Sequence, residues 1–136
     1  MTENDIAKMV VNAVYQIYTK LGPGLLESVY ERILVHELKK LGLKVAIQQD
    51  VDIVWDDIVF EKAFRADIVV EDKVVIELKA LEQTMKIHKK QTLTYVRLSG
   101  KKLGLLINLG ADNWNDAVTR VVNGLPEQDS SNSQSA

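Results

Sequence analysis

Residues 65–79 read RADIVVEDKVVIELK, and this stretch decides the fold because it has the pattern of two β-strands joined by a short turn. If the turn consists of Glu71, Asp72 and Lys73, the apolar residues on either side pair across the hairpin. The pairs on one face are then Val70 with Val74, Ile68 with Ile76, and Ala66 with Leu78. We therefore predict that this face of the hairpin belongs to the core.

The opposite face becomes polar away from the turn, where it carries Arg65, Asp67, Glu77 and Lys79. In this register Asp67 faces Glu77 with their Cβ atoms about 4.5–5.5 Å apart, a distance at which like charges repel. Lys79 points to the same side, and a divalent cation with oxygen ligands would balance the remaining charge. Two alternatives stay open: a surface ion-pair cluster of the same four residues, or a one-residue register shift that separates the carboxylates.

Apolar periodicity predicts the elements around the hairpin. Gly22-Pro23-Gly24 should end a first helix, and Gly42 should cap a second. Asp56-Asp57 suggests a turn inside the β-rich part. The predicted helices cover residues 2–20, 25–41, 87–98 and about 115–122, and the predicted strands outside the hairpin cover 45–55, 58–60 and 103–109.

This order of elements predicts a mixed α/β domain with a central sheet flanked by helices. We expect one domain over residues 1–125 and a disordered polar tail over residues 126–136. The chain has 136 residues, 46% of them hydrophobic, which is enough for a real core.

Composition narrows the class of protein. The sequence has no cysteine, so disulfides, thiolate zinc sites and thiol nucleophiles are excluded. No secretory signal or membrane span is evident, and we expect a cytoplasmic protein. The net charge of -2 does not suit a protein that coats nucleic acid, although residues 84–102 are basic and contain no acid. That run could attract a polyanion or simply be a solvated helix face; its members are Lys86, Lys89, Lys90, Arg97, Lys101 and Lys102.

Two predicted helices carry further candidates. On the second helix, Glu27 and Glu37 fall inside a wide apolar arc, where a carboxylate needs a metal or a cationic partner unless it reaches the rim. On the third, His88, Gln91 and Tyr95 share one face. Helix capping and ordinary packing of Tyr95 would explain that face equally well.

Together these motifs match a known pattern. Asp67, Glu77-Leu-Lys79 and Gln91-Thr-Leu-Thr-Tyr95 resemble the D…(D/E)xK…QxxxY signature of PD-(D/E)XK nucleases, in the order of the RecB-like branch. Gly24-Leu-Leu-Glu27-Ser-Val-Tyr30 resembles the motif of the GxxExxY protein family, a small single-domain group of that superfamily. The resemblance covers about residues 15–122.

The resemblance implies a restriction-endonuclease-like core and a role for each matching position. Asp67 and Glu77 would bind Mg²⁺ or Mn²⁺, with Glu27 as an additional ligand. Lys79 would orient the attacking water or stabilise charge on the phosphate, and Gln91 and Tyr95 would support it. The sequence departs from the expected pattern at Lys89-Lys90 and around Trp55, which leaves the substrate preference open.

The predicted function is therefore divalent-metal-dependent hydrolysis of phosphodiester bonds in nucleic acid, with DNA favoured. Lys86, Lys89, Lys90 and Arg97 would hold the backbone through phosphate contacts. One alternative is a catalytically silent module that binds nucleic acid or protein and keeps the nuclease fold. Another is an interaction protein that forms a homodimer through its first helix.

Overall fold

The computed structural model describes residues 1–125, so the predicted polar tail at 126–136 lies outside the described residues. Three α-helices, one short 3-10 helix and five strands follow one another along these residues. They are α1 (Glu3–Leu21), α2 (Glu27–Lys40), β1 (Val45–Trp55), β2 (Ile58–Val70), β3 (Val74–Lys79), α3 (Lys86–Leu98), β4 (Leu103–Asn108), η1 (Trp114–Asp116) and β5 (Val118–Val122).

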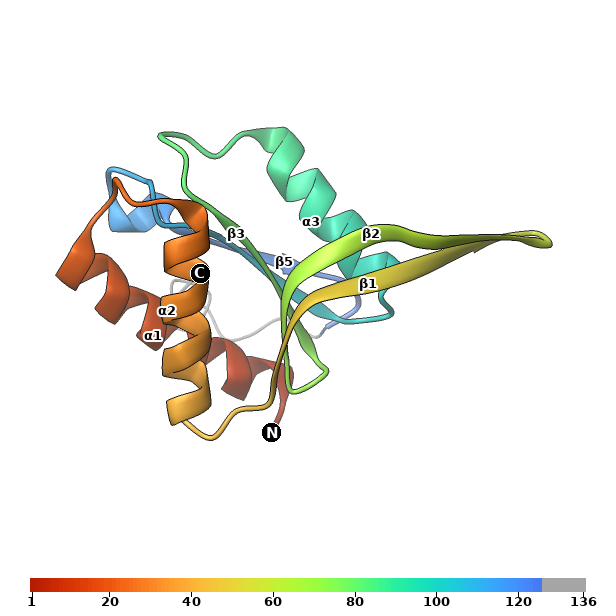
Figure 1. The fold of residues 1–136 in the computed structure, drawn as a ribbon, viewed down its shortest axis with the longest axis horizontal. Coiled ribbons are helices and arrows are strands. Elements are labelled where there is room, and N and C mark those ends of the chain that lie inside the picture. Colours follow the sequence, from red (N-terminus) through yellow and green to blue (C-terminus); the bar gives the residue numbers. More distant parts are fainter. Residues whose placement is uncertain (126–136) are drawn as a thin grey trace.

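The strands form one mixed sheet in the order β1-β2-β3-β4-β5. Only β3 and β4 run parallel, and α3 makes the crossover that a parallel connection needs. Helices α1 and α2 pack on one face of the sheet and α3 on the other (Figure 1). The predicted fold class, a mixed sheet flanked by helices, is confirmed.

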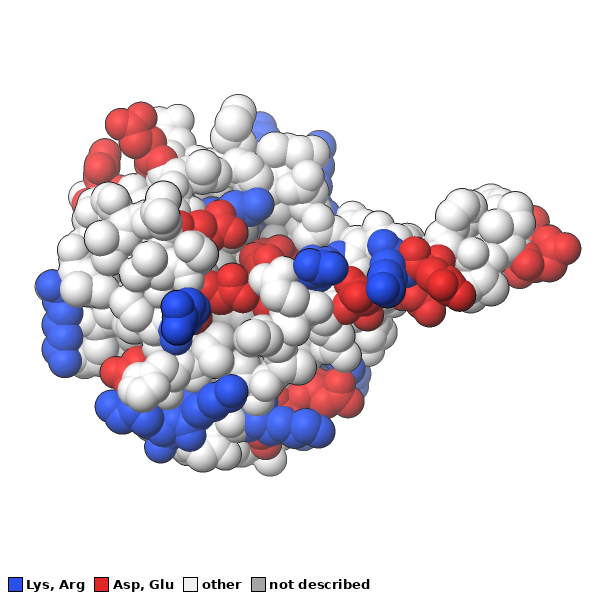
Figure 2. All heavy atoms as spheres, viewed as in Figure 1, with Lys and Arg blue, Asp and Glu red and all other residues white. Residues whose placement is uncertain are grey.

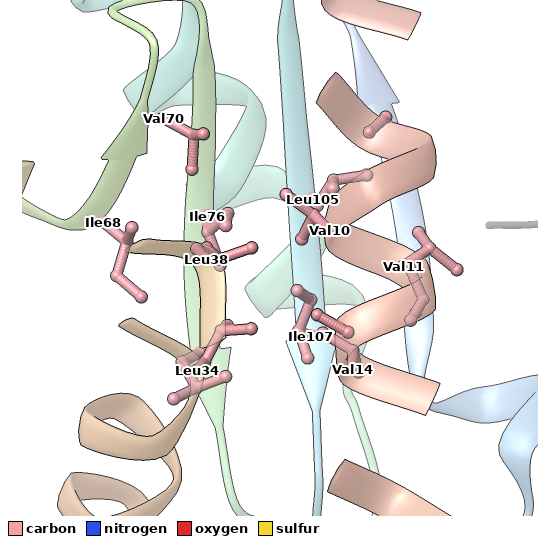
Figure 3. Close-up of a cluster of buried hydrophobic side chains, with 14 of the residues drawn as sticks. Val10, Val11, Val14, Leu34, Leu38, Ile68, Val70, Ile76, Leu105 and Ile107 are labelled. Atoms are coloured by element: carbon pink, nitrogen blue, oxygen red, sulfur yellow. The ribbon is translucent and has the colours of Figure 1, made fainter. Parts of the chain in front are cut away.

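The main core lies between the sheet and the first two helices. Ile6, Val10 and Val14 of α1 and Leu34 and Leu38 of α2 are buried against apolar residues of β2, β3 and β4 (Figure 3). The apolar face of α1 is used in this core. Within residues 1–125, no helix is long and apolar enough to cross a membrane.

Helix α3 lies very close to β4 on the other face. A Cβ atom at Gly104 would come within 2.5 Å of Val96 Cγ2 and 3.1 Å of Thr92 Cγ2, so only glycine lets the helix approach this closely. Val69 and Val75 complete the small cluster under α3. This contact places the α3 residues beside the hairpin.

The predicted hairpin register is confirmed for three backbone pairs, Val70–Val74, Val69–Val75 and Ile68–Ile76. Five of the six residues assigned to the core face lie in the main core. Ala66 is the exception, since it packs with Val69, Val75 and Val96 in the smaller cluster. The backbone pairing stops at Ile68–Ile76, so the predicted pair of Ala66 with Leu78 does not form.

Two predictions about the elements were wrong. The expected helix at 115–122 is instead the short η1 followed by strand β5, which pairs antiparallel with β4 from Leu103–Val122 to Ile107–Val118. Its β-branched valines satisfy the open edge of β4, and this pairing outweighs the helical pattern. The strand split at Phe60 is in fact continuous: β2 runs from Ile58 to Val70 and forms a long arm with β1 (Figure 1).

The apolar arc predicted on α2 is only partly buried, which gives a test of the core. Leu34 is fully buried and Leu26 is 73% exposed. Leu34→Ala should lower the free energy of unfolding by about 2–5 kcal/mol, because it removes buried methyl groups and leaves a cavity. Leu26→Ala should change it by less than about 0.5 kcal/mol. Urea denaturation of both variants measures this, and equal losses would contradict the described packing of α2.

Candidate functional site

Asp67 and Glu77 lie where strands β2 and β3 separate. Beyond the last backbone pair, Ile68–Ile76, the strands are joined by hydrogen bonds from backbone N–H groups to side chains. The backbone N–H of Leu78 donates to Asp67 Oδ2 at 2.9 Å, and the N–H of Asp67 donates to Glu77 Oε1 at 3.4 Å. Each carboxylate therefore accepts a hydrogen bond from the opposite strand, and the two acids are brought side by side.

Burial makes this pair of acids electrostatically costly. Glu77 is only 5% exposed. Its burial, together with the charge of Asp67, raises the pKa of the Glu77 carboxyl from 4.5 to about 8, although Lys79 acts in the opposite direction. Without a cation, Glu77 therefore keeps its proton at neutral pH.

Lys79 stands at the end of β3 and is half-buried. Its positive charge lowers the pKa of both Glu77 and Glu27, so it faces the same acidic region. The ion-pair alternative is wrong, because Arg65 bonds Asp50 of β1 at 3.1 Å and Glu77 is buried. Figure 2 shows acidic side chains gathered in the centre of one face, with basic side chains beside them.

Glu27 is the first residue of α2 and remains exposed, so its predicted place inside a buried arc is wrong. The reason is that the first turn of α2 buries only Tyr30. The Glu27 carboxyl still lies near the pair of acids: partial burial raises its pKa, and the Asp67 charge raises it further. Glu37 takes no part, since it pairs with Lys40 at 3.0 Å.

Tyr30 explains how the loop before α2 is held. Its hydroxyl donates to the Gly22 carbonyl at 2.5 Å and accepts the Leu25 N–H at 3.1 Å, and the ring is fully buried. Gly24 in this loop has a φ of +118°, which L side chains rarely adopt. The spacing Gly24, Glu27, Tyr30 therefore fixes the start of α2 and the position of Glu27.

Tyr95 is half-buried on α3. Burial raises the pKa of its hydroxyl, and the charges of Glu77 and Asp67 raise it further, which indicates that Tyr95 lies near the two acids. Its ring stacks on Phe64 of β2, with centroids 4.7 Å apart and planes 6° from parallel. Gln91 is exposed. His88 Nδ1 accepts the Met85 N–H at 3.0 Å, so the capping alternative is confirmed for this histidine.

Two supporting residues escaped the sequence analysis. Phe64 directly precedes the stretch 65–79, and no pattern linked it to Tyr95. Asn108, which is 1% exposed, holds the segment between Lys79 and α3. Its Oδ1 accepts the N–H groups of Leu81 and Gly110 at 2.9 and 3.0 Å, and its Nδ2 donates to Thr84 at 3.0 Å. The one available signal was an amide at the end of an otherwise apolar strand.

The basic side chains of α3 do not join the acidic pocket. Lys86, Lys89, Lys90 and Arg97 are all exposed. At ~100° per residue they lie roughly 120–180° around the helix axis from Tyr95. Lys86 and Lys89 border a hollow with Asp116 and Thr119, on the β5 side of the sheet.

The donor set fits a hard divalent cation. Mg²⁺ takes oxygen ligands and is often bound by one or two carboxylates plus waters and substrate phosphates. Asp67 and Glu77 supply two such carboxylates, and their mutual repulsion would be relieved by a cation. Within residues 1–125, no group of three or more His, Cys, Asp or Glu side chains could hold a metal ion. Glu27 is thus a neighbour of the pair rather than a member of a preformed three-ligand cluster.

The raised pKa of Glu77 has a consequence for stability. Between pH about 4.5 and 8 the folded state keeps a proton that the unfolded carboxyl loses, so the free energy of unfolding should fall as pH rises and level off above about 8. Glu77→Gln should remove this fall and be more stable than wild type at high pH. Urea denaturation with chelator across this range tests it, with exposed Glu82→Gln as the control. Parallel curves for wild type and Glu77→Gln would overturn the described burial.

Known proteins can be compared with this geometry. The profile of the PD-(D/E)XK nuclease superfamily matches residues 4–121. The fold is similar to that in the crystal structure of SSO0001, with a TM-score of 0.53 and 19% identity, which shows the fold alone. That alignment covers 98% of this chain and 64% of that one, so this chain spans less than two thirds of the other's length. No curated protein sequence matches the chain. The profile match covers nearly all the described residues, and the chain therefore belongs to the PD-(D/E)XK nuclease superfamily.

Proposed function

We propose that this protein is a divalent-metal-dependent nuclease that hydrolyses phosphodiester bonds in nucleic acid, with DNA as the favoured substrate. One observation carries the proposal: the acids Asp67 and Glu77 lie side by side, with Lys79 facing the same region. The superfamily makes nuclease activity the general expectation. Mg²⁺ or Mn²⁺ is the cation that this oxygen donor set suits.

Asp67 and Glu77 would hold the ion, and Glu27 would approach it from the start of α2. When bound, the ion supplies a water of lowered pKa and neutralises the phosphate. Glu77 must give up its proton to become a ligand, so metal binding should strengthen as pH rises toward 8. Burial of the carboxyl keeps competing solvent away from the ligand oxygen.

Lys79 would contribute positive charge where the phosphate becomes more negative during attack. Lys79 lies two residues after Glu77 on the same strand, β3, so the strand itself places its side chain on the side of Glu77. Tyr95 would bound the pocket from α3, held by its stack on Phe64. Gln91, one turn earlier on α3 and exposed, would contact Lys79 or a phosphate.

The finer resemblance, to the GxxExxY protein family, is part of the proposal. Its support is that each residue of the motif has a physical role in this chain. Gly24 has a backbone conformation suited to glycine, Tyr30 holds the loop, and Glu27 stands between them near Asp67.

The first experiment is a cleavage screen of DNA and RNA, single-stranded and duplex, with added Mg²⁺ or Mn²⁺. Lys79→Ala should lower the cleavage rate by about 100-fold or more while the urea midpoint shows a retained fold. Lys39→Ala, at an exposed position on α2, is the matched control and should cut like wild type. Metal-independent binding without any cleavage would instead support the silent binding module. Cleavage that survives Lys79→Ala would mean that another site or a contaminant is responsible.

The exposed basic residues of α3 would contact phosphates beyond the cleaved linkage. Replacing Lys90 and Arg97 by alanine should weaken binding equally across sequences, because phosphate contacts carry no sequence information. On duplex DNA the slope of log affinity against log salt should shrink by ~0.9 for each phosphate that is no longer neutralised. Fluorescence anisotropy over a salt series measures this, with Lys8→Ala/Lys39→Ala as the control pair. An unchanged slope would remove α3 from the nucleic-acid surface.

A further inference from the structure

The far end of the β1–β2 arm concentrates exposed apolar side chains. The arm projects from the body of the molecule in Figure 1, and the turn Asp56-Asp57 closes it. Around that turn Trp55 is 70% exposed and Val54 65%, and Phe60 is still 49% exposed. Ile58 and Val59 belong to the same apolar tip, which here means residues 53–60. An apolar surface of this kind, rimmed by polar residues, is typical of a binding site.

The edges of the arm are irregular, which disfavours pairing with an additional strand. The register shifts between Val51 and Ile53, and Asp52 Oδ1 accepts the Lys62 N–H at 2.9 Å across this irregularity. Gln48 and Lys62 both have positive φ, which interrupts a flat edge. Such irregularities are a common defence against edge-to-edge pairing. Contact is therefore directed to the apolar tip.

The charge of the tip selects the kind of partner. Asp52, Asp56, Asp57 and Glu61 surround the apolar residues, and Lys62 is the only basic residue between positions 52 and 62. Figure 2 shows acidic side chains at the extremity of the arm. Phosphates would be repelled here, so nucleic acid does not suit the tip. A partner surface that is both basic and apolar would suit the tip.

The outer face of α3 is such a surface. Ile87, Leu98 and the preceding Met85 are 52%, 43% and 63% exposed. At ~100° per residue, Ile87 and Leu98 lie beside Lys90 and Arg97 on the same side of the helix. No acidic residue occurs from position 84 to 102. The apolar and basic character of this face therefore complements that of the arm tip.

We infer that two copies of this chain associate, with the arm tip of each docked on the outer face of α3 of the other. The tip cannot contact α3 of its own chain, because the arm holds the tip away from the body of the molecule (Figure 1). About eight residues of β2 separate the tip from the last β2–β3 pair, a reach of about 26 Å. Reciprocal docking forms two equal contacts around a two-fold axis, as most homodimers do. A standard interface buries about 800 Å² per partner, and each copy would contribute one tip and one helix face to it.

This association does not require the proposed nuclease activity. The dimer would nevertheless cover Lys90 and Arg97, so nucleic acid and the partner's arm would exclude each other on α3. The acids Asp67 and Glu77 are not needed for the contact, although at ~100° per residue Gln91 lies only about 20° around the helix from Leu98.

Charge reversal provides the test, because it uses exposed residues and leaves the core untouched. Sedimentation analysis of the full chain at low salt should show a concentration-dependent dimer that high salt weakens. Asp56→Lys/Asp57→Lys and Lys90→Glu/Arg97→Glu should each weaken the dimer by about tenfold or more. Lys8→Glu/Lys39→Glu, which alters neither surface, should behave like wild type.

Mixing the two reversed variants is the decisive measurement. In the mixed dimer the reversed tip meets the reversed helix, and the unaltered tip meets the unaltered helix, so the mixture should regain the dimer that neither variant forms alone. Trp55 emission should shift to shorter wavelength in the same mixture as the indole leaves water. A wild-type chain that stays monomeric at low salt, or a dimer indifferent to both reversals, would overturn the inference.

Discussion

The structure depends on the point where β2 and β3 stop pairing. Up to Ile68–Ile76 the two strands share a ladder, and beyond it the carboxylates of Asp67 and Glu77 accept the backbone N–H groups that the ladder would have used. This exchange satisfies the backbone, and it also brings two acids together in a buried place. Strand β3 stays fixed there because it continues its parallel pairing with β4 as far as Lys79 and Asn108. The chemistry of the pocket and the release of β2 into the arm therefore have the same structural origin.

The helices hold the remaining parts of the pocket at a defined distance. Tyr30 anchors the loop that starts α2, so Glu27 lies near Asp67 on a fixed helix end. Asn108 anchors the segment that starts α3, and a Cβ atom at Gly110 would lie 2.6 Å from the Leu81 backbone, so this segment packs tightly on the end of β4. Phe64 then joins β2 to Tyr95 of α3. Neither Asn108 nor Phe64 needs to touch a substrate to matter, since each determines where a residue of the pocket stands.

The parts that could be predicted from sequence are those governed by local periodicity. The hairpin has matched apolar residues on either side of a short turn, so its register and the facing of Asp67 and Glu77 follow from a few residues. Strand β5 was missed because its valines also fit a helix, and only the open edge of β4 decides between the two. The place of Ala66 in the smaller cluster and the stacking of Phe64 depend on how the strands separate and twist, which no local pattern encodes. The exposure of Glu27 depends on where α2 meets the sheet, and a helical wheel carries no information about that.

The small net charge of -2 conceals a strong separation of charge. Acids occupy the pocket and the arm tip, whereas α3 presents its lysines on the side away from Tyr95. A polyanion drawn to α3 would meet repulsion at Asp67, and a cation held there would reverse it. Glu77 keeps a proton at neutral pH, because its burial and the charge of Asp67 raise its pKa. Under the proposed function, a metal ion would have to displace this proton before the site could accept a phosphate. The same separation of charge explains why the arm tip suits α3 of a second copy and not the nucleic acid itself.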